Sequence, residues 1–259
     1  MTGYVDVEEA RRLPGLRLVL TEGVPGPWSE AAKAVFHVKG IAFVRVRQEG
    51  GGENRALLEW TGQTSAPVAA WNDEPPRTTS LEILHLAERL APEPRLLPEA
   101  SEERALVLGT CLEIIGELGL GWCRRLLMFH AIVARTPEGQ EPPEAILRMC
   151  RKYGYSREAV DAAQKRVIAI LAMLARRLER QEAEGRRFLF GSTLGAADLY
   201  WATFAALLVP LPHDLCPMPD FLRWMYTSTD PAVAAALDPR LLAHRDRIYR
   251  DHLQLPLDF

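Results

Sequence analysis

The turn after the first predicted strand carries the residues best suited to chemistry. Leu16–Thr21 has the alternation of a strand, and a cluster of glycines and prolines ends it. A helix is predicted over Ser29–Lys39, because Ala32, Val35 and Phe36 fall on one helical face. A helix N-terminus offers backbone N–H groups and a partial positive charge. This turn is therefore suited to stabilising an anion.

The turn reads Gly26-Pro27-Trp28-Ser29, and its residues have alternative interpretations. The Ser29 hydroxyl could assist a bound anion or serve only as the helix N-cap. Trp28 could border a ligand or anchor the helix in the core. Gly26 and Pro27 could belong to a binding site or to an ordinary turn with proline at the first helical position. Gly26 has no side-chain donor, which leaves the N–H groups of Gly26 and Trp28.

Two later segments each place a proline or a hydroxyl residue directly before a predicted strand or helix. Pro67 directly precedes a predicted strand, Val68–Trp71, where a trans proline would begin an edge strand. Thr79 and Glu82 have the spacing of a capping box, and an amphipathic helix is predicted to follow as far as Leu90. Capping and anion binding would compete for the backbone N–H groups at that helix N-terminus.

The cysteine pattern offers little for catalysis or metal binding. Cys111, Cys123, Cys150 and Cys216 form no CxxC pair and no zinc-like spacing with histidine, so free thiols in a reducing compartment are expected. We expect no metal site. A lone histidine such as His130 on an apolar helix is usually structural.

Composition and charge indicate an ordinary globular protein. Of 259 residues, 48% are hydrophobic and 25% charged, which argues against disorder. The net charge of −3 gives no reason to expect nucleic-acid binding. The N-terminus lacks the pattern of a signal peptide. The most apolar run, near residues 204–211, is shorter than the roughly 20 residues of a membrane span, so a cytoplasmic protein without a membrane partner is predicted.

The chain is predicted to form two domains, residues 1–91 and 101–259, joined by a proline-rich linker over 92–100. The first domain has the predicted order β-α-β-α-β-β-α, with a second strand over Ile41–Arg47 and a short helix over Glu53–Thr61. The second is predicted to be an all-α bundle. Glycines between 116 and 121 interrupt its first helix, one long helix spans Ser156–Glu184, and the most apolar helix covers 196–208.

This order and four local motifs resemble the glutathione transferase superfamily, in which a thioredoxin-like α/β domain precedes an all-helical domain. The motifs are listed here: Gly26-Pro27-Trp28-Ser29, Thr64-Ser65-Ala66-Pro67-Val68, Thr79-Ser80-Leu81-Glu82 and Gly191-Ser192-Thr193-Leu194-Gly195-Ala196-Ala197-Asp198. The last resembles the family's structural capping segment. Gly26 stands where the family usually has a catalytic serine or cysteine, and Thr79 stands where it has an acid.

The resemblance implies that glutathione is the co-substrate and implies which residues bind it. Those residues are Gly26, Trp28, Ala66, Pro67, Thr79 and Ser80. It further implies a cis bond before Pro67, with Ala66 presenting its backbone to the cysteinyl part of glutathione. Ser29 is then the candidate catalytic side chain. Trp122 and Arg125 are candidates for the pocket of a small hydrophobic electrophile between the domains.

Three functions follow from the resemblance. The first is a glutathione transferase, usually a cytoplasmic homodimer active in detoxification. The second, motivated by Gly26 and Thr79, is a non-catalytic binding or interaction protein on the same scaffold. The third, a glutaredoxin-like oxidoreductase, is weak, because neither Gly26 nor Ser29 is a cysteine.

Overall fold

The computed structural model describes residues 3–259, and these divide into two compact units. Unit 1 contains the chain up to Leu97 together with Pro212–Met218 and Tyr249–Phe259. Unit 2 contains Pro98–Leu211 and Pro219–Ile248. The first segment of unit 1 ends at Leu97, within the predicted linker over 92–100. However, two later segments that the sequence assigned to the helical domain lie with unit 1.

Unit 1 is built on a three-stranded mixed sheet in the order β2-β1-β3. Its strands are β1 (Leu16–Thr21), β2 (Val44–Gln48) and β3 (Val68–Trp71). β1 is parallel to β2, as expected for the predicted β-α-β unit, and antiparallel to β3, whose direction the sequence analysis left open. The expected brief return strand is a single bridge between Ala69 and Arg77.

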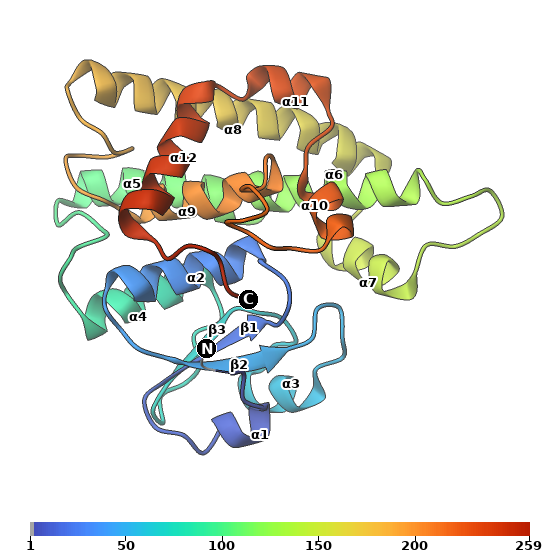
Figure 1. Cartoon of the computed structure of the whole chain (residues 1–259), viewed down its shortest axis with the longest axis horizontal. Helices are drawn as coiled ribbons and strands as arrows, with labels where there is room; N and C mark the ends of the chain where they lie inside the picture. The colour runs from blue at the N-terminus through green and yellow to red at the C-terminus, as the bar shows by residue number, and fades with distance from the viewer. Residues whose placement is uncertain (1–2) are drawn as a thin grey trace. The chain divides into compact units, whose positions relative to one another are not determined.

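Helices cover both faces of this sheet (Figure 1). They are α1 (Val7–Ala10), α2 (Pro27–Val38), α3 (Arg55–Thr61) and α4 (Ser80–Leu90). α2 and α4 lie together on one face, and α1 and α3 cover the other, where Val19, Val46 and Val68 form a buried cluster with Ala10 and Leu57. The four-residue α1 was not predicted, because it is too short to show a helical period.

Two predicted boundaries move by a few residues. The helix expected from Ser29 begins at Pro27, and the strand expected from Ile41 begins at Val44. The second shift arises because Gly40, at φ +65°, reverses the chain after α2, and the Ile41 N–H then donates back to the Phe36 carbonyl at 2.9 Å.

Unit 2 is helical, as predicted. Its elements are α5 (Ser101–Ile115), α6 (Leu120–Val133), α7 (Glu144–Tyr153), α8 (Arg157–Ala183), α9 (Ala196–Phe204), the 3₁₀ turn η1 (Ala205–Leu207), α10 (Asp220–Tyr226), α11 (Pro231–Ala236) and α12 (Pro239–His252), whose last turn passes into unit 1. Every residue of α9 is buried, which confirms that the most apolar helix is central.

Gly116 and Gly119 interrupt the predicted first helix of this unit and so separate α5 from α6. A Cβ atom at Gly116 would lie 2.7 Å from the Leu112 carbonyl oxygen, and one at Gly119 would lie 2.8 Å from the carbonyl oxygens of Leu112 and Glu113. Side chains are thus excluded at both positions, and the predicted interruption is confirmed.

The segment Ser101–Val133, which contains this break, is long and apolar enough to cross a membrane by length and composition, with a mean hydropathy of 1.5 in its most apolar window. Core helices of soluble proteins pass the same test, so the segment is weak evidence for a membrane span.

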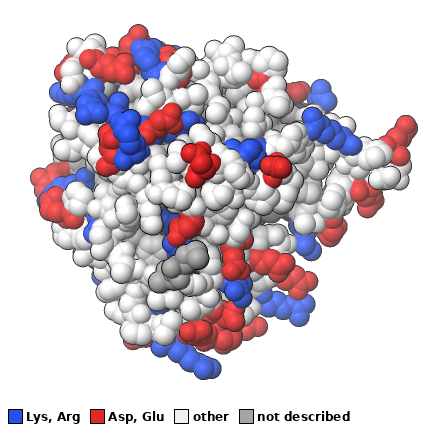
Figure 2. Space-filling view, in the orientation of Figure 1, with Lys and Arg blue, Asp and Glu red and all other residues white. Residues whose placement is uncertain are grey.

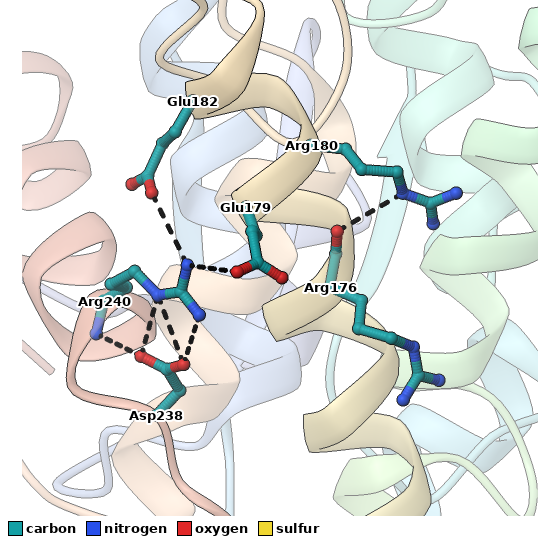
Figure 3. Close-up of polar contacts among 6 residues, drawn as sticks. All are labelled: Arg176, Glu179, Arg180, Glu182, Asp238 and Arg240. Carbon is teal, nitrogen blue, oxygen red and sulfur yellow. Dashed lines mark hydrogen bonds and ion pairs between the residues drawn. The ribbon is translucent and has the colours of Figure 1, made fainter.

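Surface ion pairs connect the start of α12 to α8 (Figure 3). The Arg240 guanidinium lies 2.7 Å from the Asp238 carboxylate and 3.4 Å from Glu179, with Glu182 at 3.9 Å. Arg240 is 39% and Glu179 61% exposed, so water and salt screen the charges and the network contributes little to stability.

Candidate functional site

The N-terminus of α2 is the centre of the candidate site. Gly26 is the N-cap, with extended backbone angles of φ −63° and ψ 126°, and it supplies no side-chain cap. Pro27 occupies the first helical position, where its missing N–H costs no hydrogen bond. The Glu30 N–H donates to the Gly26 carbonyl at 2.9 Å and closes the first turn. Ser29 is therefore inside the helix, and the alternative that it is the N-cap is wrong.

Ser29 nevertheless lies close to residue 26, where the family usually has its catalytic serine or cysteine. Its Oγ would be 3.9 Å from a Cβ atom added at Gly26, and the residue is only 3% exposed. The contact distance is ordinary and the φ of Gly26 suits any residue, so a serine or cysteine side chain would be accommodated there. The assisting role of Ser29 stays a prediction.

The second segment lies at the same end of the sheet. Val19 of β1 pairs with Val68 of β3, so antiparallel continuation of this register places Pro67 and Ala66 beside the last residues of β1, which lead into the turn before α2. The Ala66–Pro67 bond is cis, as the resemblance implied, and Pro67 is buried.

The third segment approaches the same place from β3. Ala69 and Arg77 exchange backbone hydrogen bonds of 2.7 and 2.9 Å, so the antiparallel return carries Thr79 toward the level of Pro67. α4 then begins at Ser80. The candidate binding segments of unit 1 thus gather at one end of its sheet.

A complete capping box covers the N-terminus of α4. The Glu82 N–H donates to Thr79 Oγ1 at 3.2 Å, and the Glu82 carboxylate accepts from the N–H groups of Thr78 and Thr79, both at 2.9 Å. Although burial raises the pKa of Glu82, these hydrogen bonds outweigh it and lower the pKa. The box uses the N–H groups of Thr78, Thr79 and Glu82, and those of Ser80 and Leu81 are not part of it.

Trp122 and Arg125 both lie on α6 of unit 2. The Trp122 ring centroid is 4.4 Å from that of Tyr153, and the Arg125 guanidinium carbon is 5.4 Å from the ring centre of Tyr226. The two side chains therefore belong to an aromatic cluster formed by α6, α7 and α10. Their role toward a substrate stays a prediction.

A charged cluster beside the first turn of α2 was missed by the sequence analysis. Lys33 Nζ lies 3.0 Å from the buried Glu30 carboxylate and 3.5 Å from that of Asp258, which Arg45 also contacts at 2.6 Å. Burial raises the pKa of Glu30, although Lys33 opposes the effect. The i, i+3 spacing of Glu30 and Lys33 was a visible signal, but Asp258 is 225 residues from Lys33.

Burial disfavours the thiolate form at three of the cysteines, Cys111, Cys123 and Cys150. All four cysteines are free and buried, and burial raises the pKa of Cys123 to about 11.

Within residues 3–259, no three His, Cys, Asp or Glu side chains are grouped so that they could hold a metal ion. His130 shares a 2.9 Å hydrogen bond between Nδ1 and the hydroxyl of Tyr155. On the face shown in Figure 2, acidic and basic side chains are interspersed.

Comparison with known proteins connects this arrangement to one family. Residues 157–247 match the family model described as glutathione S-transferase, C-terminal domain. No curated protein sequence matches the chain. A glutathione S-transferase from Methylobacterium radiotolerans, solved with glutathione sulfonate, is 17% identical with a TM-score of 0.62, and 91% of each chain is covered.

Two further solved structures share the fold. A rice glutathione transferase solved with glutathione is 19% identical with a TM-score of 0.61, covering 95% of this chain and 93% of that one. A maleylacetoacetate isomerase from Methylobacterium extorquens, with bound malonate and GSH, is 20% identical with a TM-score of 0.54, covering 89% and 94%.

The chain thus has the glutathione transferase fold, and its residues 157–247 match the family model of the glutathione S-transferase C-terminal domain. The predicted resemblance and the predicted fold class, a thioredoxin-like α/β part followed by a helical part, are confirmed.

Proposed function

We propose that this protein binds reduced glutathione in unit 1 and activates its thiol at the N-terminus of α2. The observation that carries the proposal is the convergence of the α2 N-terminus, the cis Ala66–Pro67 bond and the start of α4 at one end of the sheet. Two of the similar structures were solved with glutathione or GSH, which supports the same ligand.

In this proposal each segment binds a different part of glutathione. The backbone of Ala66 binds the cysteinyl residue, and Ser80 binds the γ-glutamyl carboxylate with its hydroxyl and N–H. The partial positive charge of α2 favours the thiolate over the thiol, whose ordinary pKa is about 8.5. Trp28 borders the sulfur, and Ser29 is the nearest side-chain hydroxyl.

The proposed reaction is a conjugation. The glutathione thiol loses its proton to solvent, and the sulfur lone pair forms a bond to an electrophilic carbon of a small hydrophobic substrate. For an aryl halide, halide departs with the electron pair of the broken bond. Catalysis then consists of thiolate stabilisation and proximity. Trp122 and Arg125 are proposed to contact the electrophile.

A non-catalytic binding protein is the second candidate, and Gly26 favours it. No side chain at this position can donate to the sulfur, so stabilisation of the thiolate falls to helix N–H groups and to Ser29. Thr79 also lacks the charge with which the family's acid contacts the ligand ammonium group.

Calorimetric titration with glutathione, followed by a conjugation assay with a general aryl halide across pH, separates the two candidates. Binding with a rate that rises with the thiolate fraction supports the transferase. Binding without turnover for any electrophile class supports the binding protein. Absence of binding contradicts both.

The proposed assembly is a homodimer in the cytoplasm, as is usual in this family. α5 and the turn after it expose three leucines, Leu106 at 60%, Leu112 at 48% and Leu118 at 63%. Exposed large apolar side chains of this kind are candidates for a surface that another chain covers.

A further inference from the structure

Unit 2 contains a cavity of its own, with a volume of about 330 Å³. α6, α8, α10 and the segment from Thr227 to Pro231 enclose it. This volume is at the lower end of the range of small-molecule sites. The cavity combines a buried cation with an apolar wall, and none of its lining residues belongs to the proposed glutathione site.

Arg124 of α6 supplies the buried cation. The residue is only 4% exposed, and its Nε donates to the Leu207 carbonyl at 2.7 Å. Among residues 3–259 this is the only hydrogen bond of the Arg124 side chain, and no carboxylate there lies within ion-pair distance of it. Burial lowers the pKa of Arg124 to about 10, so the guanidinium stays charged at neutral pH. Its two Nη groups remain available to a ligand.

The one carboxylate that lines the cavity is already engaged. Asp230 Oδ2 accepts from Gln164 Nε2 at 2.6 Å, and Oδ1 accepts from the N–H groups of Ala232 and Val233 at 2.9 and 3.3 Å. Asp230 is therefore held as the N-cap of α11. With Arg135 also in the lining, two cations face one anion, which leaves the cavity with a net positive charge.

The remaining wall is apolar and includes an aromatic ring. Leu127, Met128 and Met225 line it together with Trp224, and the Arg135 guanidinium carbon lies over the Trp224 ring, 4.4 Å from the ring centroid. Such a surface favours a planar or apolar body over a bare ion.

We infer that this cavity binds a small organic carboxylate. The carboxylate accepts hydrogen bonds from the Nη groups of Arg124, in the two-point geometry that suits a guanidinium, and the apolar body packs against Trp224 and Met128. This site is separate from the proposed glutathione site and does not depend on it.

Isothermal titration calorimetry of the full chain with benzoate tests the inference. Benzamide, which has the same shape without the charge, and inorganic phosphate, which has charge without the apolar body, are the matched probes. We expect benzoate to bind at least about tenfold more tightly than either, because charge-assisted bonds to a buried guanidinium are among the strongest. Saturating glutathione should leave this affinity unchanged.

Three variants distinguish a loss of benzoate binding at this site from a loss of the folded structure. Arg124→Gln should weaken benzoate binding at least about tenfold, whereas Arg240→Gln, on the surface of the same unit, should not change it. Ala131→Leu adds a side chain into the cavity from α6 without touching a charge, and it should abolish binding even if Arg124→Gln fails to fold.

Several results would overturn the inference. They are equal affinity for benzamide or phosphate, no binding of millimolar benzoate, or retained binding in folded Ala131→Leu. Competition by glutathione would instead assign the benzoate site to the glutathione pocket. Glutathione titration of Arg124→Gln reports on the proposed function alone, so the two proposals fail separately.

Discussion

Asp198 of α9 and His244 of α12 form a fully buried hydrogen bond, with 2.8 Å between Oδ1 and Nε2 and both side chains at 0% exposure. The same carboxylate accepts from the N–H groups of Leu189 and Gly195, at 2.8 and 3.0 Å. Asp198 thus does more than complete the capping segment predicted from the sequence, because it also connects the central helix to α12.

Replacing Asp198 with alanine should therefore destabilise unit 2 strongly. The change leaves a buried imidazole, the buried Leu189 N–H and the part-buried Gly195 N–H without their acceptor, and we expect a loss of about 3–5 kcal/mol in the free energy of unfolding. Urea denaturation measures it. Arg240→Ala, which removes the exposed network of Figure 3, is the control and should cost far less. Similar losses in the two variants would refute this account.

Gly26→Ser should increase the fraction of glutathione present as thiolate. A hydroxyl at this position adds one donor to the sulfur, so the pH midpoint of thiolate absorbance should fall and conjugation at neutral pH should rise about tenfold. Gly26→Ala is the matched control, since it adds the same Cβ without the hydroxyl. Equal behaviour of the two variants would show that a hydroxyl donor at residue 26 does not stabilise the thiolate.

Ser80→Ala and Thr79→Ala should have different effects. We expect Ser80→Ala to weaken glutathione binding about tenfold with little change in stability, because it removes a hydrogen bond to a charged ligand group. Thr79→Ala removes the cap of α4 and should cost about 1 kcal/mol of stability. Calorimetry and thermal unfolding on both variants would reveal a reversed pattern, which would contradict the assignment of Ser80.

The Asp258 cluster should stabilise the protein only above acidic pH. Burial raises the pKa of Asp258, but Arg45 and Lys33 outweigh it and hold the pKa below its ordinary value of 3.8. A lowered pKa in the folded state stabilises the protein above the unfolded value, and the contribution is lost as pH falls through the folded value.

Asp258→Asn should accordingly lower the free energy of unfolding by about 0.5–1 kcal/mol at pH 7, a modest value because the carboxylate is 41% exposed. The difference from the parent protein should shrink below about pH 4. Denaturant titrations at pH 7 and in acid measure it. A difference that is the same at both would show that the ion pairs are not its cause.

Leu106→Arg should dissociate the proposed homodimer. A charge placed on the exposed leucine surface of α5 cannot be buried in an interface without a large desolvation cost. Light scattering should report a dimer for the parent protein and a monomer for the variant. A parent protein that is already monomeric would refute the dimer, and His85→Arg on the exposed side of α4 serves as the control for added charge.

The parts of the site that sequence could predict are those encoded by neighbouring residues. The Pro27 turn, the Thr79 capping box and the glycine break before α6 each depend on a few adjacent residues whose backbone preferences are strong. The cis bond at Pro67 came from the family resemblance, because an X-Pro sequence by itself favours trans.

The parts that could not be predicted depend on residues distant in sequence. Asp258 reaches Lys33 only because the chain returns to α2, and Arg124 bonds to Leu207 across 83 positions. No spacing rule connects such pairs. The same applies to Asp230, whose role as a cap is visible locally but whose partner Gln164 is not.

The interleaving of the two units has a consequence for biosynthesis. Two stretches that are translated after most of the helical unit complete the thioredoxin-like unit, and the Leu257 N–H donates to the Leu215 carbonyl within it at 2.8 Å. The first-made unit can therefore reach its final packing only after Asp258 has emerged from the ribosome. A nascent chain stalled before that point would leave Lys33 of α2 and Arg45 of β2 without their contacts to Asp258.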